Sequence, residues 1–317
     1  MKLRALLLLC ILLIGGTARA DDYPSKSIRL IVPFAAGGAV GAVARVLSNP
    51  LSQSLGQSIV IDNRGGAGGI IGMDAVAKAP PDGYTLLLIH SGITYMPGLY
   101  RKLPFDPSAD FDGIIAAVSG SYVLAVTNSA PFKTVAELIS YAKANPGKLS
   151  YGVGNSTSQI VGEALKKRTQ TDIVRVPYRS NPAVMTDLIA NQIQIMIADF
   201  NTGMPQLKAG KVNALAVLTR DRHPLLPDVP TLNETVMPGY HILAWAGVFG
   251  PANMPSEAVK ALAGAIEKAL NTPVVRQRFA SSGTDIYWSG PQEFDAFVKS
   301  ELVSWTAMIK EAGIEPE

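Results

Sequence analysis

The chain has 317 residues, of which 48% are hydrophobic, 28 are basic and 25 are acidic, and it contains one cysteine. This length allows two domains with their own apolar cores, and a single cysteine excludes a disulfide framework. The formal net charge of +3 comes from Lys2, Arg4 and Arg19, so the rest of the chain is balanced. With no excess of basic residues, the sequence does not predict a nucleic-acid partner.

The first twenty residues have the parts of a secretory signal peptide. Two basic residues precede an apolar run over 5–14, and Ala-Arg-Ala at 18–20 supplies the small residues of a cleavage site. We therefore predict a signal at 1–20 that is cleaved after Ala20. Cys10 lies within the apolar run and leaves with the signal, so no thiol remains for catalysis or metal binding.

The stretch 28–45 reads as strand, loop and helix. Its first five residues are apolar enough for a buried strand, and Gly37-Gly38 lies in a loop of small residues before a helix expected to begin at Ala39. The first turn of a helix has free N–H groups and the positive end of the helix dipole. An anion could approach these groups past such small side chains, although a tight turn without a ligand explains the same pattern.

Apolar strands alternate with helices along most of the chain, which indicates α/β sheets that we expect to be parallel. Extended residues 114–127 are expected to carry the chain into a second sheet, and the proline-rich stretch 220–239 to carry it back. We therefore predict two domains, one formed by 21–118 together with 233–317 and the other by 119–232. The predicted strands are 28–32, 58–62, 84–89, 149–153, 173–177, 193–198, 212–218 and 245–251.

The three histidines, His90, His223 and His241, have no sequence neighbours that indicate catalysis or metal binding. The chain has no G-x-S-x-G and no H-E-x-x-H motif, so neither a catalytic triad nor a metal site is predicted. The glycine-rich stretch 66–72 lacks the third glycine of a dinucleotide fingerprint, which disfavours a nicotinamide cofactor. His90 follows a buried strand and is expected to be a hydrogen-bonded structural histidine. We predict no enzyme activity and no cofactor.

A second candidate anion site is the polar loop at 154–158. It offers three hydroxyls, a carboxamide and free N–H groups at the start of a helix, and the same residues are also the preferred N-caps. Asp199 follows a buried strand, where it could accept a hydrogen bond from a ligand or cap the next helix. Two such loops, one in each predicted sheet, favour a pocket for an anion.

Nine short segments spread over almost the whole mature chain form a recognisable pattern. They are Tyr23 to Lys26, Pro33 to Gly38, Asn63 to Gly69, Pro81 to Tyr84, Leu103 to Asp106, Val176 to Tyr178, Gly210 to Lys211, Leu226 to Thr231 and Pro238 to Tyr240. Together they resemble the periplasmic solute receptors of tripartite tricarboxylate transporters, also called Bug receptors. The resemblance implies an α/β fold of the type II periplasmic-binding-protein class, with two domains and two connections that close like a flytrap.

The same resemblance implies a function and a set of ligand contacts. The expected protein is a monomer in the periplasm that binds a mono-, di- or tricarboxylate and delivers it to membrane transporter subunits. The alternatives are a receptor that reports its ligand to a membrane sensor, or an exported enzyme acting on an organic acid. In the family, backbone N–H groups, hydroxyls and bridging water hold the carboxylate more than arginine does. The positions carried over are Phe34, Ala36, Gly37, Gly38, Ser91, Asn155, Ser156, Thr157, Ser158, Tyr178 and Asp199.

The chain departs from the family pattern directly after Gly38. The family usually has Ala-Thr-Asp at this point, whereas this chain has Ala39-Val40-Gly41. We expect the change to favour acids that lack a hydroxyl or amino donor for the missing aspartate. Pro50 also interrupts the following helix, and because an interior proline costs about 3 kcal/mol we expect that helix to kink or end there.

Overall fold

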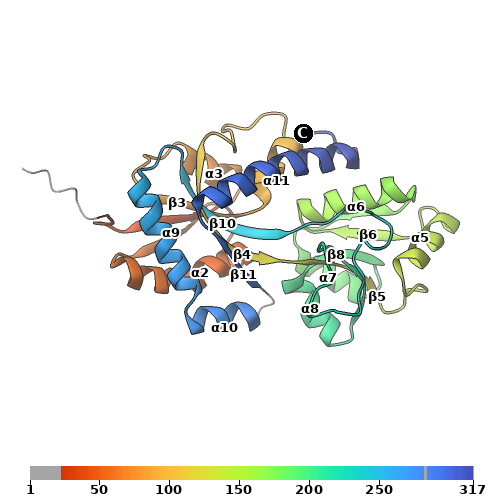
Figure 1. The fold of residues 1–317 in the computed structure, drawn as a ribbon. Coiled ribbons are helices and arrows are strands. Elements are labelled where there is room, and N and C mark those ends of the chain that lie inside the picture. The colour runs from red at the N-terminus through yellow and green to blue at the C-terminus, as the bar shows by residue number, and fades with distance from the viewer. Residues whose placement is uncertain (1–22, 282–283, 317) are drawn as a thin grey trace, which may run out of the picture.

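The computed structural model describes residues 23–281 and 284–316, so the predicted signal and its cleavage site lie outside the described residues. The described chain forms a six-stranded sheet and a five-stranded sheet, each covered by helices (Figure 1). The strands are β1 (Ile28–Val32), β2 (Ile59–Asn63), β3 (Thr85–His90), β4 (Phe111–Gly120), β5 (Tyr122–Thr127), β6 (Ser150–Val153), β7 (Val174–Pro177), β8 (Ile195–Asp199), β9 (Val212–Val217), β10 (Ala244–Pro251) and β11 (Asp285–Ser289).

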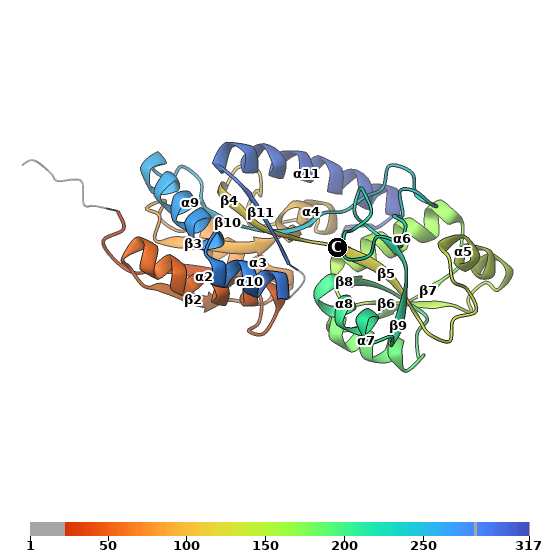
Figure 2. The same cartoon turned by 60° about the horizontal axis from the view of Figure 1, so that its bottom comes forward.

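Helices connect most of these strands and pack on the faces of the two sheets (Figures 1 and 2). They are α2 (Ala39–Leu55), the short 3-10 helix η1 (Ala67–Gly69), α3 (Ile70–Ala77), α4 (Gly92–Leu99), α5 (Val135–Ala144), α6 (Ser156–Thr169), α7 (Asn181–Ile189), α8 (Phe200–Lys208), α9 (Ser256–Leu270), α10 (Pro273–Ser281) and α11 (Pro291–Ala312).

Five neighbouring strands of the first sheet have the same arrangement as the five strands of the second. The first has the order β11-β4-β10-β3-β1-β2 and the second β7-β6-β8-β5-β9. In each, three strands of the strand-helix-strand units are parallel, namely β2-β1-β3 and β7-β6-β8. The next strand, β10 or β5, is antiparallel to them. The α/β prediction is therefore confirmed, but the expectation of purely parallel sheets is wrong. A strand that arrives directly from the other sheet enters from the opposite end and therefore runs in the opposite direction.

Two connections between strands carry the chain from the first sheet to the second and back. It crosses first where β4 ends at Gly120 and β5 begins at Tyr122, and it returns between Val217 at the end of β9 and Ala244 at the start of β10. These are the two connections expected of the fold. The predicted domain limits near 118 and 232 fall close to these crossings and stay a prediction.

Helix α11 spans both sheets in a way that the sequence did not predict. Its first half buries Phe294 and Val298 in the core of the first sheet, and its second half buries Trp305 and Ile309 in the core of the second. Figure 1 shows this helix running from above the first sheet to α6. Its end is fixed there by an ion pair with α6, in which Arg168 Nη2 donates to Glu311 Oε2 at 3.0 Å.

The expectation that α2 could end at Pro50 is wrong, because the helix continues to Leu55, and a kink at Pro50 stays a prediction. Proline removes one backbone hydrogen bond, but the buried side chains of Val43, Leu47 and Leu51 keep the helix on the sheet. Three further elements, α4, α10 and β11, were not predicted. Helix α4 has an internal proline, and neither it nor α10 has an acidic residue in its first turn, so sequence signals for both were weak.

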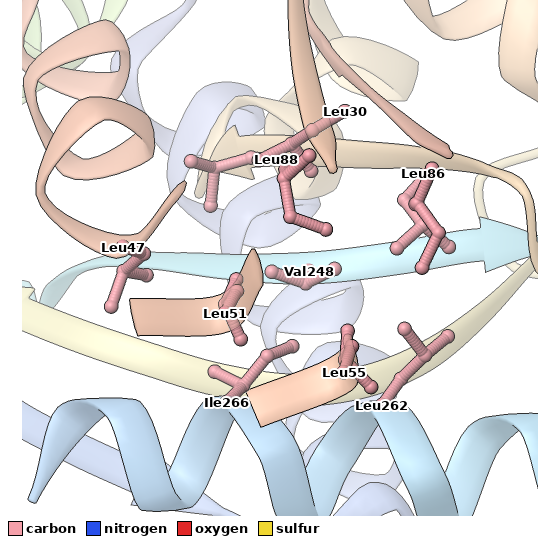
Figure 3. A pocket seen from close by; sticks show the side chains of 11 residues that line it. Leu30, Leu47, Leu51, Leu55, Leu86, Leu88, Val248, Leu262 and Ile266 are labelled. Carbon is pink, nitrogen blue, oxygen red and sulfur yellow. The ribbon is translucent and has the colours of Figure 1, made fainter. Parts of the chain in front are cut away.

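A small void lies between α2, α9 and the first sheet (Figure 3). Its volume is ≈ 10 Å³, about enough for one water molecule, and every lining side chain is aliphatic. It is therefore a packing gap in the apolar core rather than a ligand site. The lining residues are Ile28, Leu30, Leu47, Leu51, Leu55, Ile59, Leu86, Leu88, Val248, Leu262 and Ile266.

Candidate functional site

The predicted ligand contacts follow the carboxyl ends of five parallel strands. The loop 34–38 follows β1, Ser91 follows β3, residues 154–158 follow β6, Tyr178 follows β7 and Asp199 ends β8. In α/β sheets the carboxyl ends of the strands are the usual position of ligand sites. The fold therefore places the predicted residues at the expected edge of each sheet.

The small-residue loop before α2 leaves its helix N-terminus open. Ala35, Ala36, Gly37 and Gly38 are exposed, and Gly38 precedes the helix without any side-chain cap or acidic residue in the first turn. The loop is held from the neighbouring segment, where the Asn63 amide donates to the carbonyl of Phe34 at 3.0 Å. The first N–H groups of α2 therefore point out of a fixed loop without a side-chain acceptor.

A row of aromatic rings leads from this loop toward the second sheet. Phe34 stacks on His90 with ring centroids 4.7 Å apart, His90 lies 6.2 Å from Tyr95, and Tyr95 makes an edge contact with Trp305 at 5.2 Å. The His90 Nδ1 atom accepts a hydrogen bond from the N–H of Gly92 at 2.8 Å. Burial lowers the pKa of His90 to about 4, so the ring is neutral and structural, as predicted.

We expect the titration of His90 to make the protein less stable in acid. Its pKa is lower in the folded chain than in the unfolded one, so the unfolded chain binds more protons between about pH 6.5 and pH 4. Stability should fall by about 3 kcal/mol as the pH is lowered through this window. Urea unfolding of the wild type and of His90→Asn across this pH range measures the loss of stability. His90→Asn is the control, because asparagine keeps an acceptor for the Gly92 N–H and does not titrate. Equal pH dependence in the two proteins would contradict the assignment.

The start of α6 is closed by its own side chains. Asn155 Oδ1 accepts from the N–H of Ser158 at 2.8 Å, and the Ser158 hydroxyl donates to the Asn155 carbonyl at 2.8 Å. The capping role that the sequence left open is therefore present at these two residues. Because of this cap, α6 begins at Ser156, within the predicted loop. Ser156 is half-buried, whereas Thr157 and Ser158 are buried.

Two tyrosines that sequence reasoning missed meet at this helix start. The Tyr95 hydroxyl lies near Thr157 and Ser156, and the Tyr122 hydroxyl lies near Thr157 and Asn155, and these polar neighbours lower the pKa of each tyrosine. Burial raises the pKa of Tyr122 to about 12, and the nearby Asp199 carboxylate adds to the rise. Burial also raises the pKa of Tyr95. Both groups are therefore neutral hydroxyls, and Tyr95 joins α4 of the first sheet to α6 of the second.

Asp199 caps α8 and is held in place by Asn181. Its carboxylate accepts from the N–H of Thr202 at 3.0 Å and from the side-chain amide of Asn181. The amide oxygen of Asn181 is buried and has no hydrogen-bond partner among the described residues. Tyr178 donates to Asp187 Oδ2 of α7 at 2.7 Å, and burial and this bond raise its pKa to about 12. The Tyr178 hydroxyl is thus engaged with α7.

The structure brings most of the predicted contacts into one connected cluster. Phe34 joins it through His90 and Tyr95, while Ser156 and Thr157 join it through the tyrosine hydroxyls. The donors in the cluster are hydroxyls and backbone N–H groups, which suit a carboxylate without a paired arginine. Among the described residues no group of histidine, cysteine and acidic side chains could hold a metal. None of their helices is long and apolar enough to cross a membrane.

Comparison with known proteins identifies the family. The model of the tripartite tricarboxylate transporter family receptors matches residues 43–314. A protein encoded in the tcbD-tcbE intergenic region of Pseudomonas sp. strain P51 is 37% identical over 297 residues, covering 92% of this chain and 88% of the relative.

Two solved structures agree with this family match. Rpa4515 of R. palustris, solved with adipate, is 35% identical with a TM-score of 0.83, covering 93% of this chain and 100% of that one. MatC of Rhodopseudomonas palustris, solved with bound malate, is 29% identical with a TM-score of 0.78, covering 90% and 100%. The two-domain α/β fold is therefore shared with proteins that bind small solutes. This chain belongs to the tripartite tricarboxylate transporter receptor family, as the pattern of its sequence segments predicted.

Proposed function

We propose that this protein is a periplasmic receptor that binds a small dicarboxylate between its two sheets and delivers it to a tripartite tricarboxylate-type membrane transporter. The observation that carries the proposal is the cluster of neutral donors that Tyr95 joins across the two sheets. The adipate and malate bound by the two related proteins support an acid with two carboxylates. The signal-like sequence at 1–20 supports export to the periplasm.

The cluster offers two different places for the two carboxylates. The uncapped N–H groups of α2 would receive one of them, because the helix dipole favours negative charge there. The half-buried hydroxyl of Ser156 at the start of α6 would receive the other. Thr157 and Ser158 are buried beneath Ser156 in the same helix turn, and we expect them to position it rather than to touch the ligand. A ligand held at both places would favour the closed arrangement of the two domains.

The chemistry of the cluster favours binding over catalysis. The Nδ1 atom of His90 accepts from Gly92 and its ring proton is on Nε2, and with its pKa lowered to about 4 the ring has no free basic nitrogen and no charged acid form near neutral pH. Asp199 already accepts hydrogen bonds from Thr202 and Asn181. A bound acid would therefore meet donors that hold it but no activated nucleophile or base.

Mass spectrometry of the small molecules released from protein purified natively from the periplasm tests the proposal. We expect one or more aliphatic dicarboxylates to be enriched relative to a mock purification. Release of a sugar or an amine as the enriched compound would contradict the proposed ligand class.

We expect Gly41→Asp to stabilise the protein without ligand by about 1 kcal/mol, because it adds an acid to the first turn of α2. A Cβ atom at this position would lie 3.3 Å from Arg45 Nη1, so the new carboxylate would also pair with that guanidinium. Gly41→Ala is the matched control, since it adds a side chain without charge. Urea unfolding at low salt should give Gly41→Asp a higher free energy of unfolding than Gly41→Ala. A lower value for Gly41→Asp would contradict the proposed effect of the charge.

The same position is expected to set which acid is preferred. An aspartate at 41 could accept a hydrogen bond from a ligand hydroxyl, which the present glycine cannot do. The Val40→Thr, Gly41→Asp double variant should therefore bind malate more tightly relative to succinate than the wild type does. Calorimetry with both acids measures the ratio, and an unchanged ratio would show that the departure at 40–41 is structural only.

A further inference from the structure

The side chain of Arg45 extends back along α2 toward the start of the helix. A Cβ atom at Gly41, one turn earlier, would lie 3.3 Å from Arg45 Nη1. Long side chains on a helix lean toward its N-terminus, so this direction is the expected one. The guanidinium therefore lies beside the first turn, where Gly38 precedes the helix without a side-chain cap.

The surroundings of Gly41 also connect Arg45 with the loop 34–38. The same Cβ atom would lie 3.9 Å from Asn63 Nδ2. This amide donates to the carbonyl of Phe34 at 3.0 Å, at the beginning of the loop. Asn63 is thus a neighbour of both the guanidinium and the loop. Arg45 therefore borders the position that the proposed function assigns to the first carboxylate.

No acid balances the charge of Arg45 in the described chain. Among residues 23–281 and 284–316, no group forms an ion pair or a hydrogen bond with the guanidinium, and the first turn of α2 has no acidic residue. Asp62, the acid next to Asn63 in β2, accepts from Arg64 Nε at 2.8 Å. A cation beside the positive end of a helix dipole is unfavourable, so an anion between the two would be stabilised by both.

The departure from the family pattern leaves this guanidinium available. The family usually has an aspartate at the position of Gly41, and an aspartate there would pair with Arg45. We propose that Arg45 is a ligand-binding residue, whose guanidinium donates to the carboxylate held at the start of α2. A guanidinium can give two parallel hydrogen bonds to one carboxylate, which the N–H groups of the helix complement. The proposal rests on the proposed function, since the ligand is taken to be a dicarboxylate.

The test is calorimetry of Arg45→Gln with adipate and with malate at low and at high salt. Glutamine is a comparable helix former that keeps N–H donors and removes the charge. We expect the variant to bind the acid about tenfold more weakly than the wild type at low salt, because it loses a charged hydrogen-bond donor. The loss should be smaller at high salt, since Arg45 is exposed and salt screens its charge.

Two further variants separate the contact from the net charge. Arg45→Lys keeps the charge without the paired donors, so it should lose less affinity than Arg45→Gln. Arg29→Gln is the matched control, because it removes an exposed arginine from the amino end of β1, the opposite end of that strand from the loop 34–38. We expect wild-type affinity in this control.

The melting temperature without ligand distinguishes a ligand contact from structural support. Arg45→Gln should melt at the same temperature as the wild type or higher, because it removes a cation from the positive end of α2. A lower melting temperature together with an equal loss of affinity at low and high salt would show that Arg45 only supports the loop, which overturns the proposal.

The wild-type titration separates the failure of this proposal from the failure of the proposed function. If the wild type binds neither adipate nor malate, the proposed ligand class is wrong and the role of Arg45 falls with it. If the wild type binds an acid and Arg45→Gln binds it equally well at low salt, the receptor function stands and the role of Arg45 is overturned.

Discussion

Gly154→Ala should lower the free energy of unfolding by about 2 to 3 kcal/mol and weaken acid binding at least tenfold. A Cβ atom at Gly154 would lie 2.5 Å from the backbone nitrogen of Asn181 and 2.6 Å from the carbonyl carbon of Ser180. Backbone atoms cannot turn aside as a flexible side chain can, so α7 must move. Because the amide of Asn181 holds the carboxylate of Asp199, the displacement would spread through the second-sheet half of the site.

Gly264→Ala is the control for this substitution. It makes the same chemical change in α9, where nothing lies within 4 Å of the added Cβ atom. We expect that variant to be more stable than the wild type by about 0.5 to 1 kcal/mol, because alanine is the better helix former. Chemical denaturation and calorimetry of both variants measure the two effects. Wild-type stability and affinity in Gly154→Ala would show that the contact of Gly154 with Asn181 does not shape the site.

Removing the hydroxyls at the start of α6 should separate binding from stability. Thr157→Val should lower the free energy of unfolding by about 1 to 3 kcal/mol, because two buried tyrosines, Tyr95 and Tyr122, lose a hydrogen-bond partner. Ser156→Ala should lower the stability less than Thr157→Val does, because Ser156 is half-buried and neighbours Tyr95 but not Tyr122. It should weaken acid binding by roughly tenfold to a hundredfold, because its hydroxyl is the proposed carboxylate donor.

A control substitution at an exposed serine and a double-mutant cycle complete this experiment. Ser140→Ala removes an exposed hydroxyl in the middle of α5 that donates to the Ala136 carbonyl of its own helix, so it should change neither the free energy of unfolding nor the affinity for the acid. The Tyr95→Phe and Thr157→Val pair should be non-additive, since the Thr157 side chain lies near the Tyr95 hydroxyl and lowers its pKa. A loss of affinity in Thr157→Val alone, with none in Ser156→Ala, would reverse the roles assigned to these residues.

Local patterns were enough to predict most of the fold and the strand ends at which the candidate loops lie. The small residues before Ala39 and the polar residues at 154–158 mark the ends of buried strands, and the structure places both at the carboxyl edges of their sheets. The strand-helix alternation predicted α/β sheets. It did not reveal the antiparallel β5 and β10, because strand direction depends on the route that the chain takes between the sheets.

The parts that could not be predicted depend on contacts between distant segments. Tyr95 lies in α4, a short helix with an internal proline, and its partners on α6 are about sixty residues away along the chain. The bridging role of α11 rests on Trp305, whose spacing predicts only a buried helix face and not which sheet receives it. Pro50 is a further example of a feature that depends on distant contacts. The sequence marks it as a helix-breaking residue, but the side chains of α2 that are buried against the sheet keep the helix intact past it.

Calorimetric titration of the wild type with adipate and malate, and with the corresponding diamides, tests the central claim most directly. Each diamide has nearly the shape of its acid but no negative charge for the N–H groups of α2 and the hydroxyl of Ser156 to hold. We predict that at least one of the two acids binds at a single site and that neither diamide shows measurable binding. Binding of a diamide as tight as that of its acid, or no binding of either acid, would contradict the account.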